Sequence, residues 1–177
     1  MLLLTLLTGQ RGQALHSLRV SDVRMFSQKC VINFSEKHKH TRPGCHTEPA
    51  NILAFSGNDR LCLVKHFRAY LDQTKDLRQR EANLFISSAR PHKAVSCDTF
   101  SRLVKLVLAA AGIDTEHFGS HSICAASTSE AARRGITLAT IMKAGGWSSQ
   151  KTFCMFYNKA PAQNFGQAVM DSCMKKS

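Results

Sequence analysis

The side chains best suited to chemistry stand in four separate segments of the 177-residue chain. They are Arg11 after Thr-Gly-Gln, a basic turn containing Lys39, His121 before Ser-Ile-Cys, and Trp147 followed by Tyr157. Guanidinium groups hold phosphate oxygens with charged, bidentate hydrogen bonds, whereas lysine and histidine side chains transfer protons. A phenol can attack a phosphodiester and conserve the bond energy in a covalent ester. Together these residue types suit a reversible exchange of phosphate esters.

The charge of the chain favours a polyanionic partner. It has 24 Lys and Arg residues against 12 Asp and Glu, a formal net charge of +12 and a pI near 9.7. A basic surface gains free energy by releasing counterions from phosphates, so nucleic acid is favoured over an anionic membrane surface. Residues 131–170 contain no Asp or Glu, which predicts DNA contacts there rather than a merely solvated face. The basic side chains of this stretch are Arg133, Arg134, Lys143, Lys151 and Lys159.

Several classes of site and partner are not expected. Seven cysteines without a Cys-x-x-Cys pair indicate reduced thiols in a cytosolic or nuclear protein. His38, His40, Cys45 and His46 lie close together in the sequence, but their spacing matches no common zinc module. We expect no metal and no cofactor. The apolar residues 1–7 are too short to cross a bilayer and lack the flanks of a signal peptide, so we expect no membrane partner.

Hydrophobic periodicity and cap residues predict a mostly α-helical domain with one small antiparallel β-sheet. Helices are expected over residues 2–7, 12–19, about 60–73, 98–111, 120–134, 137–144 and 163–174, with further helical turns around 153–157. Strands are expected over residues 23–33 and 50–55, joined by a turn at residues 37–44. Asp98 is predicted to cap its helix. The core stripe of that helix is predicted to be Phe100, Leu103, Val107, Leu108 and Ala111.

In order and spacing, the four segments resemble the catalytic core of the tyrosine recombinases, the phage integrase family. Residues 6–22 are similar to the family's Thr-Gly-x-Arg segment, the turn at residues 37–44 to its lysine-bearing β-turn, and residues 121–124 to its His-x-x-Arg motif. The sequence Ala-Gly-Gly-Trp-Ser-Ser at residues 144–149, with Phe-Tyr at 156–157, is closest to the DIRS and Crypton recombinases of eukaryotic mobile elements. Bacterial members usually have a His in place of Trp147, and their tyrosine comes one residue sooner. The resemblance covers residues 2–161.

The resemblance implies a recombinase-like fold and a role for each residue. Tyr157 would be the nucleophile that forms a covalent 3′-phosphotyrosine with DNA, and Arg11 would hold the non-bridging oxygens of the transition state. Lys39, with Lys37 as the close alternative, would protonate the leaving 5′-oxygen. Lys37 and Arg42 in the same turn would contact the DNA.

His121 and Trp147 complete the set of residues that the resemblance implies. His121 would transfer a proton or bind the phosphate, and Trp147 would pack the pocket and offer an indole N–H. Each residue also has a structural alternative. Arg11 and Lys39 would then be surface charges, His121 a donor at a helix start, and Trp147 and Tyr157 core aromatics. Their joint occurrence in the family's order favours the catalytic interpretation.

The chain departs from the family at Cys124, which stands where the family has its second arginine. A thiol with an ordinary pKa offers no positive charge in exchange. The nearest basic residues downstream, Arg133 and Arg134, would lie about 13–15 Å further along the same helix, too far to substitute. Losing an arginine at a phosphoryl group costs about 10³–10⁵ in rate, so we expect very poor DNA cleavage or none.

Three functions therefore stay open. The first is an active recombinase. The second is a non-catalytic DNA-binding module or a decayed remnant of a mobile element. The third is protein interaction through the C-terminal helix, with Phe165, Val169 and Met170 as its apolar stripe; the resemblance suggests a homo-oligomer on double-stranded DNA. We expect residues 1–177 to form one catalytic domain without the family's N-terminal clamp domain, in a nuclear protein.

Overall fold

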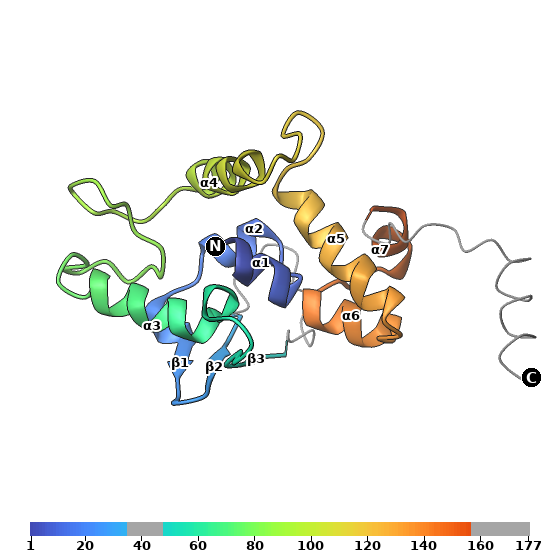
Figure 1. Cartoon of the computed structure of the whole chain (residues 1–177), viewed down its shortest axis with the longest axis horizontal. Helices are drawn as coiled ribbons and strands as arrows, with labels where there is room; N and C mark the ends of the chain where they lie inside the picture. Colours follow the sequence, from blue (N-terminus) through green and yellow to red (C-terminus); the bar gives the residue numbers. More distant parts are fainter. Residues whose placement is uncertain (35–47, 157–177) are drawn as a thin grey trace, which may run out of the picture.

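A computed structural model describes residues 1–34 and 48–156 of the chain. The described part is mostly helical and has one three-stranded antiparallel sheet, as predicted (Figure 1). The helices are α1 Leu2–Thr8, α2 Gly12–His16, α3 Leu63–Thr74, α4 Cys97–Ala110, α5 Ser120–Arg133, α6 Leu138–Gly145 and α7 Gln150–Phe156. The strands are β1 Val23–Met25, β2 Lys29–Ile32 and β3 Ala50–Leu53, and short 3₁₀ turns cover Val20–Asp22 and Asp59–Leu61.

The three strands lie in the order β1-β2-β3, and both neighbouring pairs are antiparallel. The prediction of one strand over residues 23–33 was wrong, because a tight turn divides that segment into β1 and β2. In this turn the Phe26 amide donates to the Lys29 carbonyl at 2.8 Å, and the exposed Ser27 and Gln28 reverse the chain. Val23 then lies opposite Ile32.

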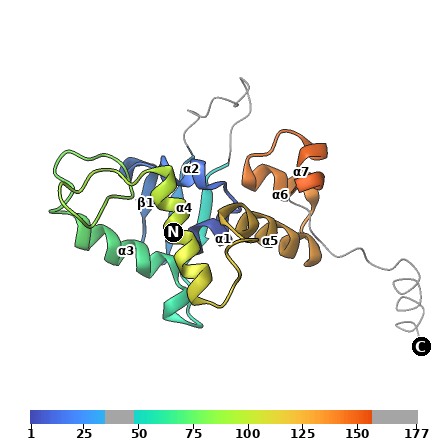
Figure 2. The ribbon, with the colours of Figure 1, turned by 90° about the horizontal axis from the view of Figure 1, so that it is seen from above.

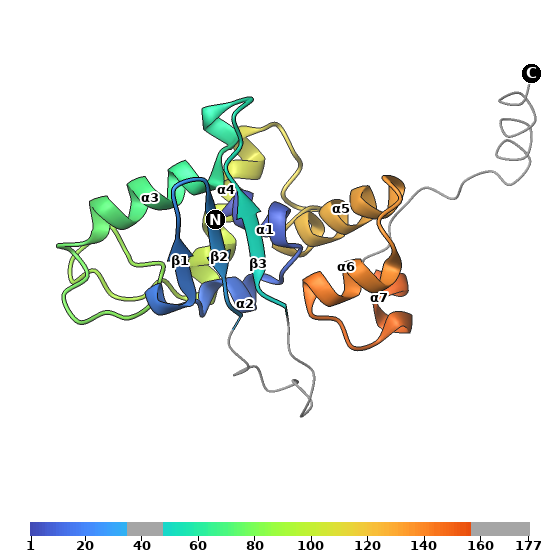
Figure 3. The ribbon, with the colours of Figure 1, turned by 90° about the horizontal axis from the view of Figure 1, so that it is seen from below.

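Helix α1 lies at the centre of the molecule. It packs against α2 and α5, and α2 packs in turn against α4. Helices α5, α6 and α7 gather at one end in all three views, whereas α3 reaches the other end and the sheet lies between, beside α1 (Figures 1, 2 and 3). The segment that leaves α1 is therefore placed between the two ends.

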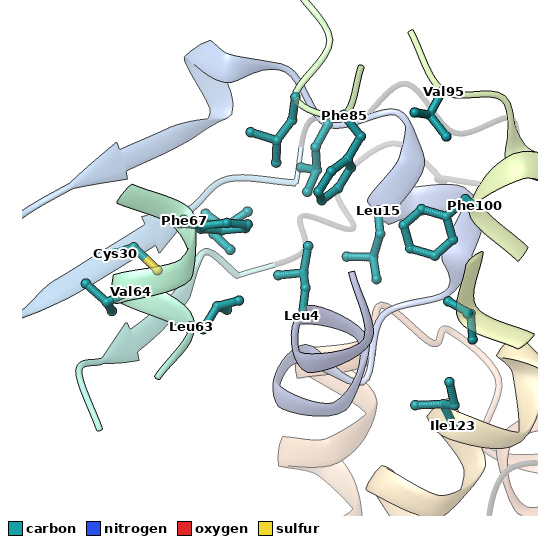
Figure 4. Packing of buried hydrophobic residues seen from close by; sticks show 14 of the residues in the cluster. Leu4, Leu15, Cys30, Leu63, Val64, Phe67, Phe85, Val95, Phe100 and Ile123 are labelled. Atoms are coloured by element: carbon teal, nitrogen blue, oxygen red, sulfur yellow. The ribbon is translucent and has the colours of Figure 1, made fainter. Parts of the chain in front are cut away.

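Two clusters of buried hydrophobic side chains hold these elements together. In the larger one, Leu4 of α1, Leu15 of α2, Phe67 of α3 and Phe100 of α4 gather around a common centre (Figure 4). Phe100 meets Phe85 edge to face with ring centroids 6.0 Å apart, which is a favourable aromatic geometry. The smaller cluster consists of Ile141, Trp147 and Phe153, from α6, α7 and the turn between them.

Local signals define several helix ends. Gly9 after α1 and Gly146 after α6 have the positive φ angles of 63° and 66° that favour glycine, as their predicted stop positions require. The Thr137 side chain accepts from the Thr140 amide and caps α6, as predicted. The cap of α4 is Ser96 and not Asp98, which lies in the first helical turn.

Other boundaries differ from the predictions. Helix α2 ends at His16 rather than at residue 19, and α3 begins at Leu63, because a separate 3₁₀ turn occupies Asp59–Leu61. The core stripe of α4 also differs. Phe100, Val104 and Leu108 are buried, whereas the expected Leu103, Val107 and Ala111 are exposed. Both stripes fit the helical period, and packing against α2 and α5 selects the first.

Three further features concern the described residues only. None of their helices is long and apolar enough to cross a membrane. Nowhere among them do three or more His, Cys, Asp or Glu side chains gather closely enough to hold a metal ion. The five cysteines among the described residues are free thiols.

Two valines on α4 test the orientation of this helix. Val104 is 1% exposed and Val107 is 47% exposed. We expect Val104→Ala to lower the free energy of unfolding by about 2 kcal/mol, because it leaves a cavity in the core. The matched change Val107→Ala should alter it by less than about 0.5 kcal/mol. Urea unfolding followed by circular dichroism measures both values, and the reverse order would contradict this packing.

Candidate active site

Arg11 occupies the sharp connection between α1 and α2. The left-handed Gly9 ends α1, and Arg11 has the extended φ and ψ angles of an N-cap, −69° and 147°. Its carbonyl accepts the amides of Ala14 and Leu15, which begins α2. The side chain of Arg11 is half-buried. The backbone of this residue is thus fixed by the two helices that it joins.

The Arg11 guanidinium lies over the indole of Trp147. Its Cζ atom is 5.7 Å from the centroid of the indole, within the range of a cation–π interaction. Trp147 is itself held in place, being 6% exposed and packed edge to face on Phe153 with centroids 5.0 Å apart. The fold therefore brings together two predicted site residues that are far apart in the sequence.

The turn before Trp147 depends on two glycines. Gly146 closes α6 with its positive φ angle, and the Trp147 amide then donates to the Met142 carbonyl at 2.9 Å. At Gly145 any side chain would collide with the indole, since a Cβ atom would come within 1.6 Å of it. The Gly-Gly-Trp sequence is thus required for the indole to pack this closely against the end of α6.

Gln10 joins the Arg11 segment to its surroundings, and sequence reasoning did not identify it as a site residue. Its side-chain amide donates to the Ala144 carbonyl at 2.7 Å. Its backbone carbonyl accepts from the Cys124 thiol at 3.0 Å, and its amide donates to Thr8 Oγ1 at 3.3 Å. The only sequence signal was its place beside Arg11, and nothing local distinguished it from a surface glutamine.

Cys124 lies at this junction, fully buried on α5. Burial raises the pKa of its thiol to about 11, although the nearby positive charge of Arg11 acts in the opposite direction. The thiol is consequently neutral at physiological pH and donates its hydrogen bond to Gln10. The position at which the sequence lacks an arginine is indeed next to Arg11, but it carries no charge.

His121 lies in the first turn of α5, three residues before Cys124, and its side chain is exposed. Residues three apart share one side of a helix, so His121 and Cys124 face the same side. The first turn of α5 contains no acidic residue, and the helix dipole makes this end favourable for an anion. The exposed imidazole is therefore accessible at the start of α5, in the turn before Cys124.

Arg133 and Arg134, which were expected to contact DNA, form ion pairs at the far end of α5. Arg133 holds Glu130 with two hydrogen bonds of 2.8 Å, and Arg134 Nε donates to the same carboxylate at 2.7 Å. The hydrogen bonds to these two guanidinium groups lower the pKa of Glu130 to about 2, and the one from Arg133 has the larger effect. The sequence pattern did not reveal this partner, because Glu130 precedes the acid-free stretch by one residue.

The two described lysines of the same stretch are exposed. Lys143 on α6 forms an ion pair with Glu48, just before β3. Lys151 is on α7, the helix that carries Phe153 of the smaller cluster. They lie on the two short helices that precede and follow Trp147 in the chain.

The remaining predicted residues lie outside the part of the chain that the structure describes. They are Lys37, Lys39, Arg42, Tyr157 and Lys159, together with the apolar residues Phe165, Val169 and Met170 of the predicted C-terminal helix and the His and Cys residues at 38, 40, 45 and 46. The structure thus brings Arg11, Cys124 and Trp147 together and places His121 on the same helix as Cys124.

Comparison with known proteins gives a consistent result. The model of the phage integrase family matches residues 1–164. The fold is similar to that of XerA recombinase, with a TM-score of 0.66, 18% identity, and coverage of 98% of this chain and 54% of that one. It is also similar to the Tn1549 transposon integrase in complex with transposon right end DNA, with a TM-score of 0.64, 14% identity, and coverage of 99% and 58%.

A third similar structure is a lambda integrase dimer bound to a COC′ core site, with a TM-score of 0.53, 17% identity, and coverage of 93% of this chain and 42% of that one. The chain thus spans about half the length of the solved structures that it matches. A comparison of the sequence with curated proteins finds no match.

The burial of Cys124 predicts its reactivity. At pH 8 we expect iodoacetamide to label the exposed Cys97 and Cys154 rapidly and to leave Cys124 unmodified, because the thiolate is the reactive form and Cys124 is both buried and neutral. Peptide mapping by mass spectrometry measures the labelling of each site. If Cys124 in the folded chain were labelled as fast as Cys97, it would not be buried and neutral. As the control, unfolding in urea should expose Cys124 and allow its labelling.

The same pKa has a consequence for stability. The folded-state pKa of Cys124, about 11, lies above its ordinary value of 9.0. The neutral thiol therefore makes its full contribution to the free energy of unfolding below about pH 9. This contribution is lost as the pH rises through about 11, because the unfolded chain then releases the proton more readily than the folded chain. Because burial also raises the pKa of Cys30, the measurement is the difference in unfolding free energy between wild type and Cys124→Ala at several pH values. This difference should shrink above pH 9.

Proposed function

The chain belongs to the phage integrase family, the tyrosine recombinases, and on that premise we propose that it binds double-stranded DNA as a recombinase catalytic core with impaired cleavage. One observation carries this proposal. The Arg11 guanidinium is held over Trp147 beside a buried and uncharged Cys124. The site retains one phosphate-binding arginine and lacks the second.

Binding to DNA is supported by charge and by position. The net charge is +12, and the exposed Lys143 and Lys151 lie on the helices that flank Trp147. Such side chains contact the sugar-phosphate backbone and contribute affinity without reading the base sequence. Arg133 and Arg134 are engaged by Glu130, and Lys143 is paired with Glu48, so these three contribute less to this surface than Lys151. A DNA backbone passing over α6 and α7 would bring a phosphate to Arg11.

The chemistry proposed for such a phosphate follows from the family motifs. The Tyr157 hydroxyl would give up its proton, with His121 as the proposed acceptor, as its oxygen attacks the phosphorus and forms a 3′-phosphotyrosine. The bond to the 5′-oxygen breaks, and that oxygen takes a proton from Lys39 or Lys37. Arg11 would stabilise the non-bridging oxygens, with His121 at the rim. Rejoining is the reverse step, so the exchange needs no metal, cofactor or external energy source.

Cleavage by this route is expected to be slow because the second positive charge is missing. Cys124 is neutral, its thiol is hydrogen-bonded to Gln10, and Arg133 and Arg134 lie at the opposite end of α5. Removing an arginine from a phosphoryl-transfer site costs about 10³–10⁵ in rate. The same observation favours a second candidate function, a DNA-binding module without catalysis, left from a decayed element.

The origin and setting of the chain are also proposals. The Ala-Gly-Gly-Trp-Ser-Ser sequence at residues 144–149, with Trp147 where bacterial members have His, supports a source among DIRS or Crypton elements. An element of this kind acts on chromosomal DNA, so the proposed location is the nucleus. Assembly on DNA would use a second copy, through the apolar residues of the predicted C-terminal helix, Phe165, Val169 and Met170.

The salt dependence of DNA binding tests the role of Lys151. We expect Lys151→Gln to weaken binding of a duplex and to reduce the slope of log affinity against log salt by about 1, because one phosphate contact is lost. The matched control is Lys75→Gln, at the exposed end of α3, which should leave the slope unchanged. Fluorescence anisotropy at several salt concentrations provides the data. Equal slopes for wild type and Lys151→Gln would exclude a phosphate contact at this residue.

Covalent trapping on nicked duplexes tests the impaired chemistry. We expect the wild-type chain to form almost no DNA–protein adduct and Cys124→Arg to increase adduct formation by about 10²-fold or more, because it restores a charged donor. Cys124→Ser should not increase it, and Tyr157→Phe should abolish any adduct. Denaturing gels with a pool of nicked sequences measure the yield. Efficient trapping by the wild-type chain through Tyr157 would show that the second arginine is dispensable.

A further inference from the structure

We propose that Gln10 is a positioning residue that holds Arg11 in register with Trp147. The positioning is a property of the folded chain alone. Its effect on phosphate binding rests on the function proposed above.

The side chain of Gln10 occupies a place where a polar group needs a partner. It is 4% exposed, and a buried amide is costly unless it forms hydrogen bonds. Its Nε2 donates at 2.7 Å to the carbonyl of Ala144. This carbonyl belongs to the last turn of α6, where helical carbonyls lack a partner within the helix. One hydrogen bond thus satisfies both groups and joins the Arg11 segment to the end of α6.

The backbone of Gln10 is attached on its other sides. Its carbonyl accepts from Cys124 of α5, and its amide donates to Thr8 Oγ1, which itself donates to the Leu4 carbonyl of α1 at 2.7 Å. Gln10 therefore has contacts with three helices, α1, α5 and α6. Arg11 is the next residue, so these contacts fix the backbone position from which its side chain extends.

The same hydrogen bond sets the position of the indole. Ala144 lies three residues before Trp147, and the two glycines between them leave no side chain to separate the indole from α6. Arg11 and Trp147 are thus attached to the opposite ends of one short link, through Gln10 and Ala144. The 5.7 Å separation of guanidinium and indole is the expected result of this link. A methionine at position 10 would fill a similar volume but could not donate the hydrogen bond to the Ala144 carbonyl.

Trp147 is the only tryptophan in the chain, so its fluorescence reports directly on this contact. The experiment compares the full chain with Gln10→Met, Arg11→Met and the double variant, using the emission maximum and acrylamide quenching. We expect each single variant to change both quantities. In the Gln10→Met background, Arg11→Met should add little further change, because the contact is already lost. This non-additivity is the signature of positioning.

A matched control separates positioning from general loss of stability. Thr74 is buried on α3, away from the site, and its hydroxyl donates to the Tyr70 carbonyl at 2.7 Å. Thr74→Val removes this hydrogen bond and the one that the hydroxyl accepts from Arg78 at 2.8 Å, and it should lower stability without changing the Trp147 signal. Equal effects of Arg11→Met in the wild-type and Gln10→Met backgrounds would overturn the proposal. A wild-type spectrum for Arg11→Met would do the same.

Two additional measurements complete the test. Gln10→Leu is also of similar size and offers no donor, so it should behave like Gln10→Met. If both variants fail to fold while Thr74→Val folds, Gln10 is a structural residue and the positioning role is refuted.

On duplex DNA, Gln10→Met and Arg11→Met should each weaken affinity by about 10-fold. If the wild-type chain binds no DNA while the fluorescence coupling is present, the proposed function fails and the positioning role stands.

Discussion

The hydrogen bond between the Gln10 side chain and the Ala144 carbonyl is the interaction on which the candidate site depends. It joins the segment that leaves α1 to the last turn of α6. The larger hydrophobic cluster holds α1 through Leu4, and the smaller cluster holds the α6–α7 unit through Trp147 and Phe153. Helix α5 also connects the two clusters, through Ile123 in the larger one and through Ala131 and Ala132 packed against the smaller one. The contact of Arg11 with Trp147 arises where these parts meet, and Gln10 joins the two segments that carry it.

Cys124 shows how the shape and the chemistry of this site can separate. Its buried thiol is hydrogen-bonded to Gln10, and the burial keeps it neutral. The residue thus supports the junction without carrying a charge. The fold depends on packing and hydrogen bonding, whereas the proposed chemistry depends on particular charges at particular points, so the two can change independently.

Predictions succeeded where neighbouring residues alone determine the structure. Gly9, Thr137 and Gly146 mark helix ends because each acts within one turn, through a positive φ angle or a side-chain cap. Predictions failed where the local sequence fitted more than one structure. The turn at Ser27 and Gln28 has no glycine or proline, so β1 and β2 looked like one strand. On α4, two apolar stripes fit the helical period, and only contact with other helices distinguishes the buried Val104 from the exposed Val107.

The sequence by itself determined the family motifs and their order, the positive charge, and the departure at Cys124, because residue identity and spacing carry this information without coordinates. Only the tertiary structure decided which side chains meet. The cation–π contact of Arg11 with Trp147, the role of Gln10 and the pairing of Glu130 with Arg133 and Arg134 each depend on how side chains are oriented once the helices have packed. Contacts between distant segments form only when burial of the shared core brings the helices together, and no short stretch of sequence encodes that arrangement.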